Sequence, residues 1–428
     1  MKSCLLIECC DYHWEVFPAW ANLLGELGCA VDIVCPDTPG HLETLAMMDV
    51  RRFPIERLWE LPFDRYDLVL IGTLRHEGYY HDHGIGPLPG LNLIERIGRP
   101  SISVIHEPTL WVEQRPVMSF DGRHSRGEGI VNLFPDHSYN WVGRWVEECR
   151  WSQEGDRLVL SENGNRIELE STDGGVTFLG VRNKVLCRRP QPQVDLEGHT
   201  RSGRHAIVSF SRQGAEHLRA RCPDAAWILP FESLEPPPPA AAGEYVFAGS
   251  IDYENKAMAS LVRACSALAP HETLVVLGGG RSTQFDENPH VRRLKDDLAA
   301  LGVGDKVRFT GYQPYDSFIE HVRSSRFLLP LVDDRIANGD YRTRMTATIP
   351  LSLGLGVPMI INEAIARHHD LDFMVTYPGE DLAVGLAAAR GLSDGDYARL
   401  RERTLAAARH LKLHNIETLS GILRRITA

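Results

Sequence analysis

Short, continuous apolar runs alternate with helix-like segments along most of the chain, and this alternation limits the fold more than any other feature. The first runs are CLLIECC at 4–10 and AVDIVCPD at 30–37, with a helix predicted at 16–28 between them. DLVLIG at 67–72 and SISVIH at 101–106 continue the pattern. Strands that are apolar on both faces belong to parallel sheets that helices cover on both sides. The pattern therefore predicts an α/β chain with doubly wound parallel sheets.

A run of four prolines divides this pattern into two parts. Residues 235–243 read EPPPPAAAG, and consecutive prolines continue neither a helix nor a central strand. We therefore predict an N-terminal domain at 1–235, a linker at 236–243 and a C-terminal domain at 244–405. The length of 428 residues suits two or three domains of about 100–200 residues each.

The second part repeats the alternation of strands and helices. Strands are predicted at 245–250, 273–280, 306–312, 326–332 and 357–362. Helices are predicted at 256–268, 289–302, 315–325, 343–355 and 381–392. A last helix is predicted from about 394 to 428, with a break near 410–414, and residues 406–428 are expected to cross back to the N-terminal domain. Because ligands bind at the carboxyl ends of the strands in such sheets, we expect a cleft between the domains.

The alternation breaks down between His106 and about residue 200. Within 155–182, the short runs LVL, IELE and VTFLGV are separated by Asn-Gly and Asp-Gly-Gly, a pattern typical of β-hairpins. We predict an insertion in the N-terminal domain at about 110–200, β-rich at 155–182. The preceding tryptophan-bearing stretch is expected to form loops and one short helix. We expect the insertion to determine acceptor or partner specificity.

Composition and charge exclude several classes of protein. Apolar residues make up 43% and charged residues 24%, which excludes a disordered chain or a coiled coil. The net charge of −11 argues against a general nucleic-acid binder. Nine scattered cysteines without zinc-site spacing indicate reduced thiols and a cytoplasmic protein. Residues 182–221 contain nine basic and three acidic side chains, and they form either a solvated face or a surface that contacts an anionic membrane or a charged acceptor.

An ordered series of segments in the second half resembles a known family. The series is NKAMASLVRACSAL, LVVLGGG, LGVGDKVRFTGYQPYDSFIEHVRSSRFLLPL, SLGLGVPMIIN and YPGEDLAVGLAAARGLSD. It is similar to the C-terminal half of GT-B-fold glycosyltransferases of the large retaining family (glycosyl transferases group 1), over about 245–405. The first half resembles the family in outline only. The resemblance implies a GT-B fold, in which two Rossmann-like, doubly wound domains face a cleft, here with a small β insertion in the N-terminal domain.

The resemblance also implies an activity. The expected enzyme is a glycosyltransferase that moves a sugar from a nucleotide-diphosphate sugar to an acceptor hydroxyl, in surface glycan, glycolipid or secondary-metabolite synthesis. It would be retaining, independent of metal and without a cofactor, and it would act on a glycan, lipid-linked, protein or small-molecule acceptor. Two alternatives stay open: a GT-B-type sugar-nucleotide epimerase, and a non-catalytic GT-B-like partner or sugar-binding protein.

Candidate donor-binding residues follow from the resemblance. Lys256, one of only six lysines, lies where a basic residue of the family contacts the donor diphosphate. Ser250 stands where the family often has Arg, and Arg342 and Arg344 are candidates for a diphosphate clamp. The remaining candidates for the nucleotide or the cleft are Gly249, Gly278, Gly279, Tyr312, Asp340 and Thr343. The structural alternatives are a solvated lysine and a surface arginine pair.

Two positions differ from the family's sequence pattern, and one loop could hold a metal ion. The family's Glu-x7-Glu pattern falls on Thr343 and Leu351, so neither carboxylate is present. This difference leaves the donor open and favours the non-catalytic alternative. Three histidines in the loop RHEGYYHDHGIG are compatible with metal binding, but we predict no metal site there. They are His76, His81 and His83.

Candidate residues for catalysis and for the acceptor lie in the first half. His106 ends a predicted strand at the cleft, where a histidine or another polar residue of the family often touches the donor sugar. His13 is a second catalytic candidate, in the loop after the first strand. Tyr12 and Trp14 flank it and are candidates to stack on an acceptor sugar. The structural alternatives are a capped strand end and a core tryptophan.

Overall fold

The computed structural model describes most of the chain. The described residues are 2–10, 16–74, 90–113, 118–124, 127–134, 137–142, 149–162, 165–171, 173–180, 184–188, 196–232, 243–253, 255–278, 288–333 and 341–427.

The first part of the chain forms a seven-stranded sheet in which every pair is parallel, with the order β15-β14-β5-β4-β1-β2-β3. Its strands are β1 (Lys2–Ile7), β2 (Cys29–Cys35), β3 (Arg51–Pro54), β4 (Leu68–Ile71), β5 (Ser101–Ile105), β14 (His205–Ser209) and β15 (Ala226–Trp227). Its helices are α1 (Phe17–Glu26), α2 (Pro39–Ala46), α3 (Gly90–Ile97), α5 (Leu196–Arg201) and α6 (Arg212–Leu218). The strand order reverses between β1 and β4. In sheets of this type, ligands bind at such a switch point, beyond the carboxyl ends of the strands.

The later part of the chain forms a second parallel sheet, with the order β18-β17-β16-β19. Its strands are β16 (Glu244–Ala248), β17 (Thr273–Leu277), β18 (Val307–Gly311) and β19 (Phe327–Leu328). A bridge between Leu328 and Met359 leads to a parallel pair, β20 (Ile360–Asn362) and β21 (Val375–Tyr377). The helices are α7 (Met258–Cys265), α8 (Pro289–Ala300), α9 (Tyr315–Ser324), α10 (Thr348–Leu355), α11 (Glu363–His368) and α12 (Leu382–Arg390).

One predicted helix of this part begins later than expected. We expected a helix from residue 343, but α10 begins at Thr348, and this prediction was wrong. The Thr343 carbonyl accepts a hydrogen bond from the Ser211 hydroxyl of the other domain, at 2.6 Å. This tertiary contact holds the residues before α10 in a turn.

The insertion is an eight-stranded antiparallel sheet that α4 (Pro108–Glu113) precedes. Its strands are β6 (Met118–His124), β7 (Gly127–Leu133), β8 (Tyr139–Val142), β9 (Arg150–Glu154), β10 (Arg157–Glu162), β11 (Asn165–Ser171), β12 (Thr177–Gly180) and β13 (Lys184–Arg188). A bridge between Ser138 and Arg150 joins the ends of the two edge strands. The predicted hairpins are present as β10, β11 and β12.

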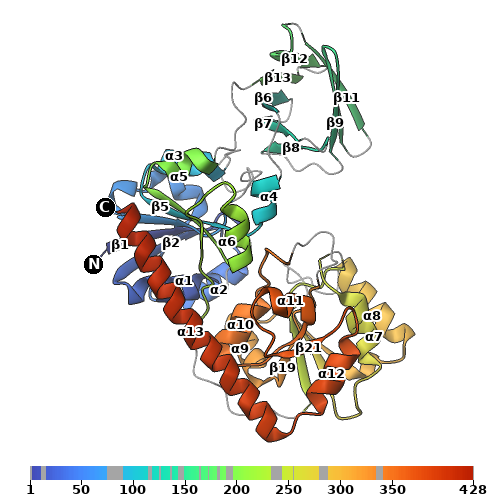
Figure 1. Cartoon of the computed structure of the whole chain (residues 1–428). Coiled ribbons are helices and arrows are strands. Elements are labelled where there is room, and N and C mark those ends of the chain that lie inside the picture. Colours follow the sequence, from blue (N-terminus) through green and yellow to red (C-terminus); the bar gives the residue numbers. More distant parts are fainter. Residues whose placement is uncertain are drawn as a thin grey trace.

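The expectation of loops before these hairpins was wrong, because residues 118–142 and 150–154 supply four further strands. A hairpin alone cannot bury its apolar face. Here the extra strands bring Phe120 and Tyr139 against Phe178 in a separate small core. In Figure 1 this sheet stands out beyond α4, away from the two parallel sheets.

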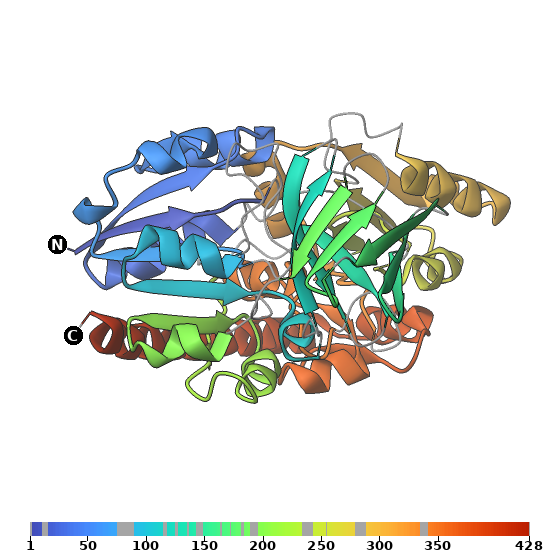
Figure 2. The ribbon, with the colours of Figure 1, turned by 90° about the horizontal axis from the view of Figure 1, so that it is seen from above.

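A single helix, α13 (Asp394–Ile426), runs for 33 residues along both parts of the molecule (Figures 1 and 2). It contacts α10 in the second part, and α1, β14 and β15 in the first. The break expected near residues 410–414 was wrong. Leu411, Asn415 and Leu419 are all buried, so the buried face continues through this segment at helical spacing.

Candidate functional site

Three polar residues meet at the switch point of the first sheet. Glu8 follows β1, Thr73 follows β4 and His106 follows β5, so each lies just beyond the carboxyl end of its strand. Because β1, β4 and β5 are neighbours in the sheet, the three side chains come together although they are far apart in sequence.

Hydrogen bonds connect these three residues. Thr73 Oγ1 donates to Glu8 Oε2 at 2.8 Å and lies 3.3 Å from His106 Nε2. His106 Nε2 lies 2.9 Å from the Gly72 carbonyl oxygen. The edge of the imidazole packs against the Phe210 ring, with 4.6 Å between ring centroids. The arrangement fixes the position of the His106 ring at the edge of the sheet.

Lys256 lies two residues before α7, in the second part of the chain. Its ammonium lies 3.4 Å from the Pro330 carbonyl oxygen, 3.3 Å from Thr346 Oγ1 and 5.3 Å from the centre of the Tyr341 ring. Burial, together with repulsion from Arg344, lowers the pKa of Lys256 to about 8, and Asp252 opposes both effects. The side chain is half-buried and contacts the protein, and its role toward the donor stays a prediction.

The turn that begins at Tyr341 connects the two domains. Arg344 Nη1 lies 3.1 Å from Glu107 Oε1. Glu107 directly follows His106 in the chain. Thr343 Oγ1 lies 3.3 Å from Thr109 Oγ1. The Tyr341 hydroxyl donates to the Asn255 carbonyl at 3.0 Å, next to Lys256. The ion pair thus brings a cation of the second domain to the strand end that carries His106.

The other described candidates occupy the strand ends of the second sheet. Gly249 and Ser250 follow β16, Gly278 follows β17 and Tyr312 follows β18. Gly278 has φ +84°, which suits glycine in the turn. The Tyr312 hydroxyl donates to Glu43 Oε2 of the first domain at 2.8 Å, and burial together with this carboxylate raises its pKa to about 12. Arg342 is exposed, whereas the Arg344 side chain is one-third exposed.

Several predicted residues lie outside the described part of the chain. They are Tyr12, His13, Trp14, Gly279 and Asp340, together with the loop histidines His76, His81 and His83. Their proposed roles stay predictions.

The sequence reasoning missed Glu8, Thr73, Glu107 and Tyr341. A signal existed for Glu8, because it is the only charged residue in the apolar run CLLIECC. Glu107 directly follows His106 in sequence. Thr73 and Tyr341 carry no such signal, since their contacts depend on strand order and on the docking of the two domains.

The described residues also bear on metal, membrane and redox chemistry. Within the described ranges, no group of three or more His, Cys, Asp or Glu side chains is arranged to hold a metal ion. No helix in this part of the chain combines the length and apolarity that a bilayer span requires. All nine cysteines are described, and each is a free thiol. The basic segment 182–221 contributes β13 to the antiparallel sheet and α5, β14 and α6 to the first domain, so its basic residues are divided between the insertion and the first domain.

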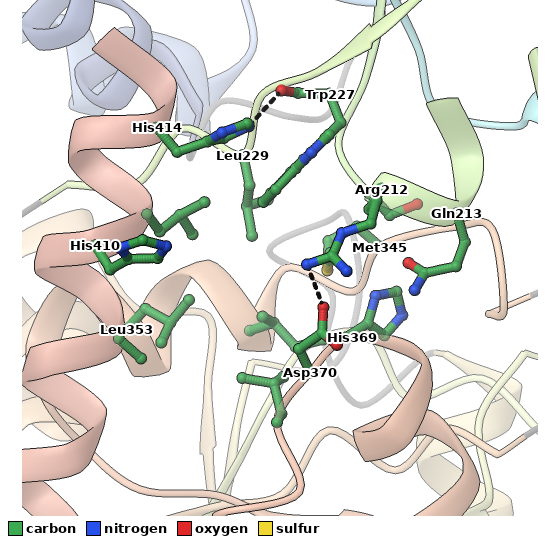
Figure 3. A pocket seen from close by; sticks show the side chains of 15 residues that line it. Arg212, Gln213, Trp227, Leu229, Met345, Leu353, His369, Asp370, His410 and His414 are labelled. Carbon is green, nitrogen blue, oxygen red and sulfur yellow. Dashed lines mark hydrogen bonds and ion pairs between the residues drawn. The ribbon is translucent and has the colours of Figure 1, made fainter. Parts of the chain in front are cut away.

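A separate cavity of about 360 Å³ lies between the two domains and α13 (Figure 3). Arg212 pairs with Asp370 across it at 2.6 Å, and His414 stacks on Trp227 at 4.1 Å between ring centroids. His369 also lines it and lies 3.0 Å from the Tyr341 carbonyl; burial lowers its pKa to about 4, so the ring is neutral at pH 7. None of the described site residues predicted from the sequence lines this cavity.

Comparison with known proteins gives a result at the level of structure alone. No protein-family model matches the chain. No curated protein matches it in sequence.

Solved structures, by contrast, match nearly the whole chain. HepE of Anabaena, solved with UDP and glucose, is similar over 98% of this chain and 99% of its own, with 11% identity and a TM-score of 0.55. A glycosyltransferase of Rickettsia africae matches over 99% and 96%, with 12% identity and a TM-score of 0.54. Sucrose-phosphate synthase of Thermosynechococcus elongatus matches over 99% and 100%, with 14% identity and a TM-score of 0.50. Together with the two parallel sheets that α13 connects, this likeness shows that the chain has the GT-B fold.

Proposed function

We propose that the chain is a glycosyltransferase that moves a sugar from a nucleotide-diphosphate sugar to an acceptor hydroxyl. The observation that carries the proposal is the ion pair between Arg344 of one domain and Glu107 of the other, which brings Arg344, with Lys256 near it, to the strand end that carries His106. Fixed cations stabilise a diphosphate leaving group, and a polar side chain beside them can orient the reacting hydroxyl. The HepE structures that share this fold contain UDP, with glucose or as UDP-glucose, so UDP-sugars are the first donors to test.

Lys256 and Arg344 are suited to hold the donor diphosphate. Arg344 presents a planar guanidinium that binds phosphate oxygens in pairs. Its present partner, Glu107, is 42% exposed, so the pair is near the surface and a diphosphate can replace the carboxylate at low cost. Lys256 supplies a second positive charge beside it. We propose that these two cations neutralise the leaving group without a metal ion.

His106 is suited to contact a hydroxyl of the sugar or the acceptor. In the retaining reaction that we propose, the acceptor oxygen bonds to the anomeric carbon on the face from which the diphosphate leaves. The bond from this carbon to the diphosphate breaks, and its electron pair stays on the diphosphate. The acceptor proton passes to a phosphate oxygen. His106 then orients the reacting groups.

The test is transfer by the purified full chain from a panel of nucleotide sugars to hydroxyl acceptors. Lys256→Ala and Arg344→Ala are each expected to lower kcat/KM by about 10²-fold, as the loss of a fixed electrostatic contact usually does. His106→Ala is expected to lower transfer without changing the melting temperature appreciably. Lys412→Ala is the matched control, because Lys412 pairs with Glu26 away from this site.

Each other outcome contradicts a defined part of the proposal. Wild-type rates in all three site variants would overturn the site assignment. A changed sugar in the donor, formed without an acceptor, would indicate an epimerase instead. No melting-temperature shift with any nucleotide sugar would indicate a non-catalytic protein, because a ligand that binds the folded chain stabilises it.

A further inference from the structure

We propose that Glu8 is a positioning residue for His106 and acts on it through the Thr73 hydroxyl. The proposal rests on the proposed function, in which His106 contacts a reacting hydroxyl. It adds a role for a carboxylate that is fully buried.

The direction of each hydrogen bond follows from the atoms involved. The Gly72 carbonyl oxygen can only accept, so the His106 Nε2 atom 2.9 Å away carries a proton. The Thr73 hydroxyl has one proton, which it donates to Glu8 Oε2 at 2.8 Å. Its oxygen is then an acceptor for His106 Nε2–H, 3.3 Å away. The chain of donors therefore runs from His106 through Thr73 to Glu8.

The two acceptors, the Gly72 carbonyl and the Thr73 hydroxyl, place the proton of His106 on Nε2. In the neutral ring with its proton on Nε2, the lone pair lies on Nδ1. Nδ1 is then the ring atom that can act as an acceptor. A third group that orients a histidine in this way is a general feature of sites in which the histidine contacts a reacting group.

Groups of the first domain donate hydrogen bonds to the buried Glu8 carboxylate. Glu8 is 0% exposed, and a buried carboxylate is costly unless hydrogen bonds satisfy it. Cys10 N–H donates to Glu8 Oε1 at 3.0 Å, and the Thr73 hydroxyl donates to Glu8 Oε2. Both oxygens thus accept, as suits an ionised carboxylate. At position 72 a Cβ atom would lie 2.8 Å from Glu8 Oε2, so glycine is needed there to leave room for the carboxylate.

Other charged and titratable groups lie near Glu8 and near His106, the two ends of this chain of hydrogen bonds. The Cys35 thiol lies close enough to Glu8 for the carboxylate to raise its pKa, although burial is the larger cause, and Arg52 and Glu56 act on the same thiol. Next to His106, the charged pair is Glu107 and Arg344. Glu8→Gln removes the Glu8 charge and leaves these groups in place. The effect of the Glu8 charge on His106 can therefore be measured separately from the effects of the other groups.

Histidine NMR on the full chain tests the proposal without any need for enzyme activity. The chain is labelled with ¹⁵N-histidine, and His106→Ala identifies the His106 signals. In the wild type we expect the tautomer with a proton on Nε2. In Glu8→Gln we expect the pH at which His106 takes up a second proton to fall by about half a unit or more, because the nearby negative charge that favours the imidazolium is lost.

Thr73 variants provide a second test of the proposal if Glu8→Gln does not fold. Thr73→Val breaks the connection and is expected to reproduce the NMR change, whereas Thr73→Ser keeps the hydroxyl and should restore wild-type behaviour. Ser103→Ala is the control, because Ser103 is buried in β5, the same strand that leads to His106. An unchanged tautomer and titration midpoint of His106 in both Glu8→Gln and Thr73→Val would overturn the proposal.

Kinetics then separates positioning from a purely structural role. Glu8→Gln and Thr73→Val are each expected to lower kcat about tenfold, with the donor KM within about twofold. In a His106→Ala background, neither substitution should lower kcat further, because both act through His106. Additive losses would contradict the proposal. A failure of the proposed function would be visible separately, as absent transfer with the NMR result intact.

Discussion

The charge of Lys256 depends on pH close to neutrality. Burial of the side chain and repulsion from the Arg344 guanidinium lower its pKa to about 8. Below that pH the side chain is a cation, and above it the side chain is a neutral amine. A donor diphosphate would favour the charged form, so proton uptake by Lys256 and donor binding are linked.

We therefore expect nucleoside-diphosphate affinity to fall as the pH rises from 7 to 9. Calorimetric titration with UDP at several pH values measures this loss, and buffers of different protonation enthalpy reveal the proton taken up. In Lys256→Arg the decline above pH 8 should disappear, because arginine does not titrate in this range. An equal decline in wild type and Lys256→Arg would assign the pH dependence to another group.

At the scale of the residue, the sequence placed Lys256 at the start of a helix and His106 at the end of a strand, but it did not predict their partners. His106 follows a strand and Lys256 precedes a helix, and the hydrophobic pattern alone predicts both elements. Glu8 and Thr73 are 65 positions apart, and their contact depends on β1 and β4 being neighbours, which the pattern does not determine.

At the scale of the element, α13 shows why helix boundaries depend on tertiary contacts. Residues 409–415 read RHLKLHN, a polar run that favours a break. In the fold, the Asn415 side chain instead accepts from Leu229 N–H at 3.2 Å and donates to the Leu229 carbonyl at 2.6 Å. His414 stacks on Trp227 in the same segment. These contacts keep the helix continuous where its own sequence is weak.

Replacement of Asn415 is expected to destabilise this junction. Asn415→Ala leaves a buried N–H and a buried carbonyl without their present partner, so we expect a loss of about 2–4 kcal/mol in the free energy of unfolding. Urea denaturation followed by circular dichroism measures it. Leu413→Ala, on the exposed side of the same helix turn, should change stability by less than about 0.5 kcal/mol. Equal losses in the two variants would show that the Leu229 contact contributes nothing.

At the scale of the whole molecule, hydrogen bonds and ion pairs hold the two domains together. The contacts are Arg344 with Glu107, Ser211 with Thr343, Arg212 with Asp370 and Tyr312 with Glu43. The two-sheet architecture was predictable, because buried parallel strands produce unmistakable apolar runs. The eight-stranded sheet of the insertion was not, since strands such as β6 and β7 alternate with polar residues and contain glycines.

We expect Tyr312→Phe to open the cleft. The lost hydrogen bond to the Glu43 carboxylate contributes about 1.5 kcal/mol, which corresponds to about a tenfold shift between closed and open molecules. A distance between fluorophores on the two domains, or small-angle scattering, measures this shift. Tyr253→Phe is the matched control, because its hydroxyl donates to Asp297 at 2.7 Å within one domain. Equal opening in both variants would contradict a specific role for the Tyr312 contact.

The course of α13 has a consequence for biosynthesis. Leu419, Ile422 and Ile426 belong to the hydrophobic core that also contains Trp20 and Val104 of the first domain. Lys2 Nζ donates to Thr427 Oγ1 at 3.0 Å, so the start and end of the described chain touch. The ribosome makes the first sheet early, but the helix that covers it emerges after every other described element. Until then the nascent domain exposes an apolar face, and we expect it to need a chaperone throughout translation.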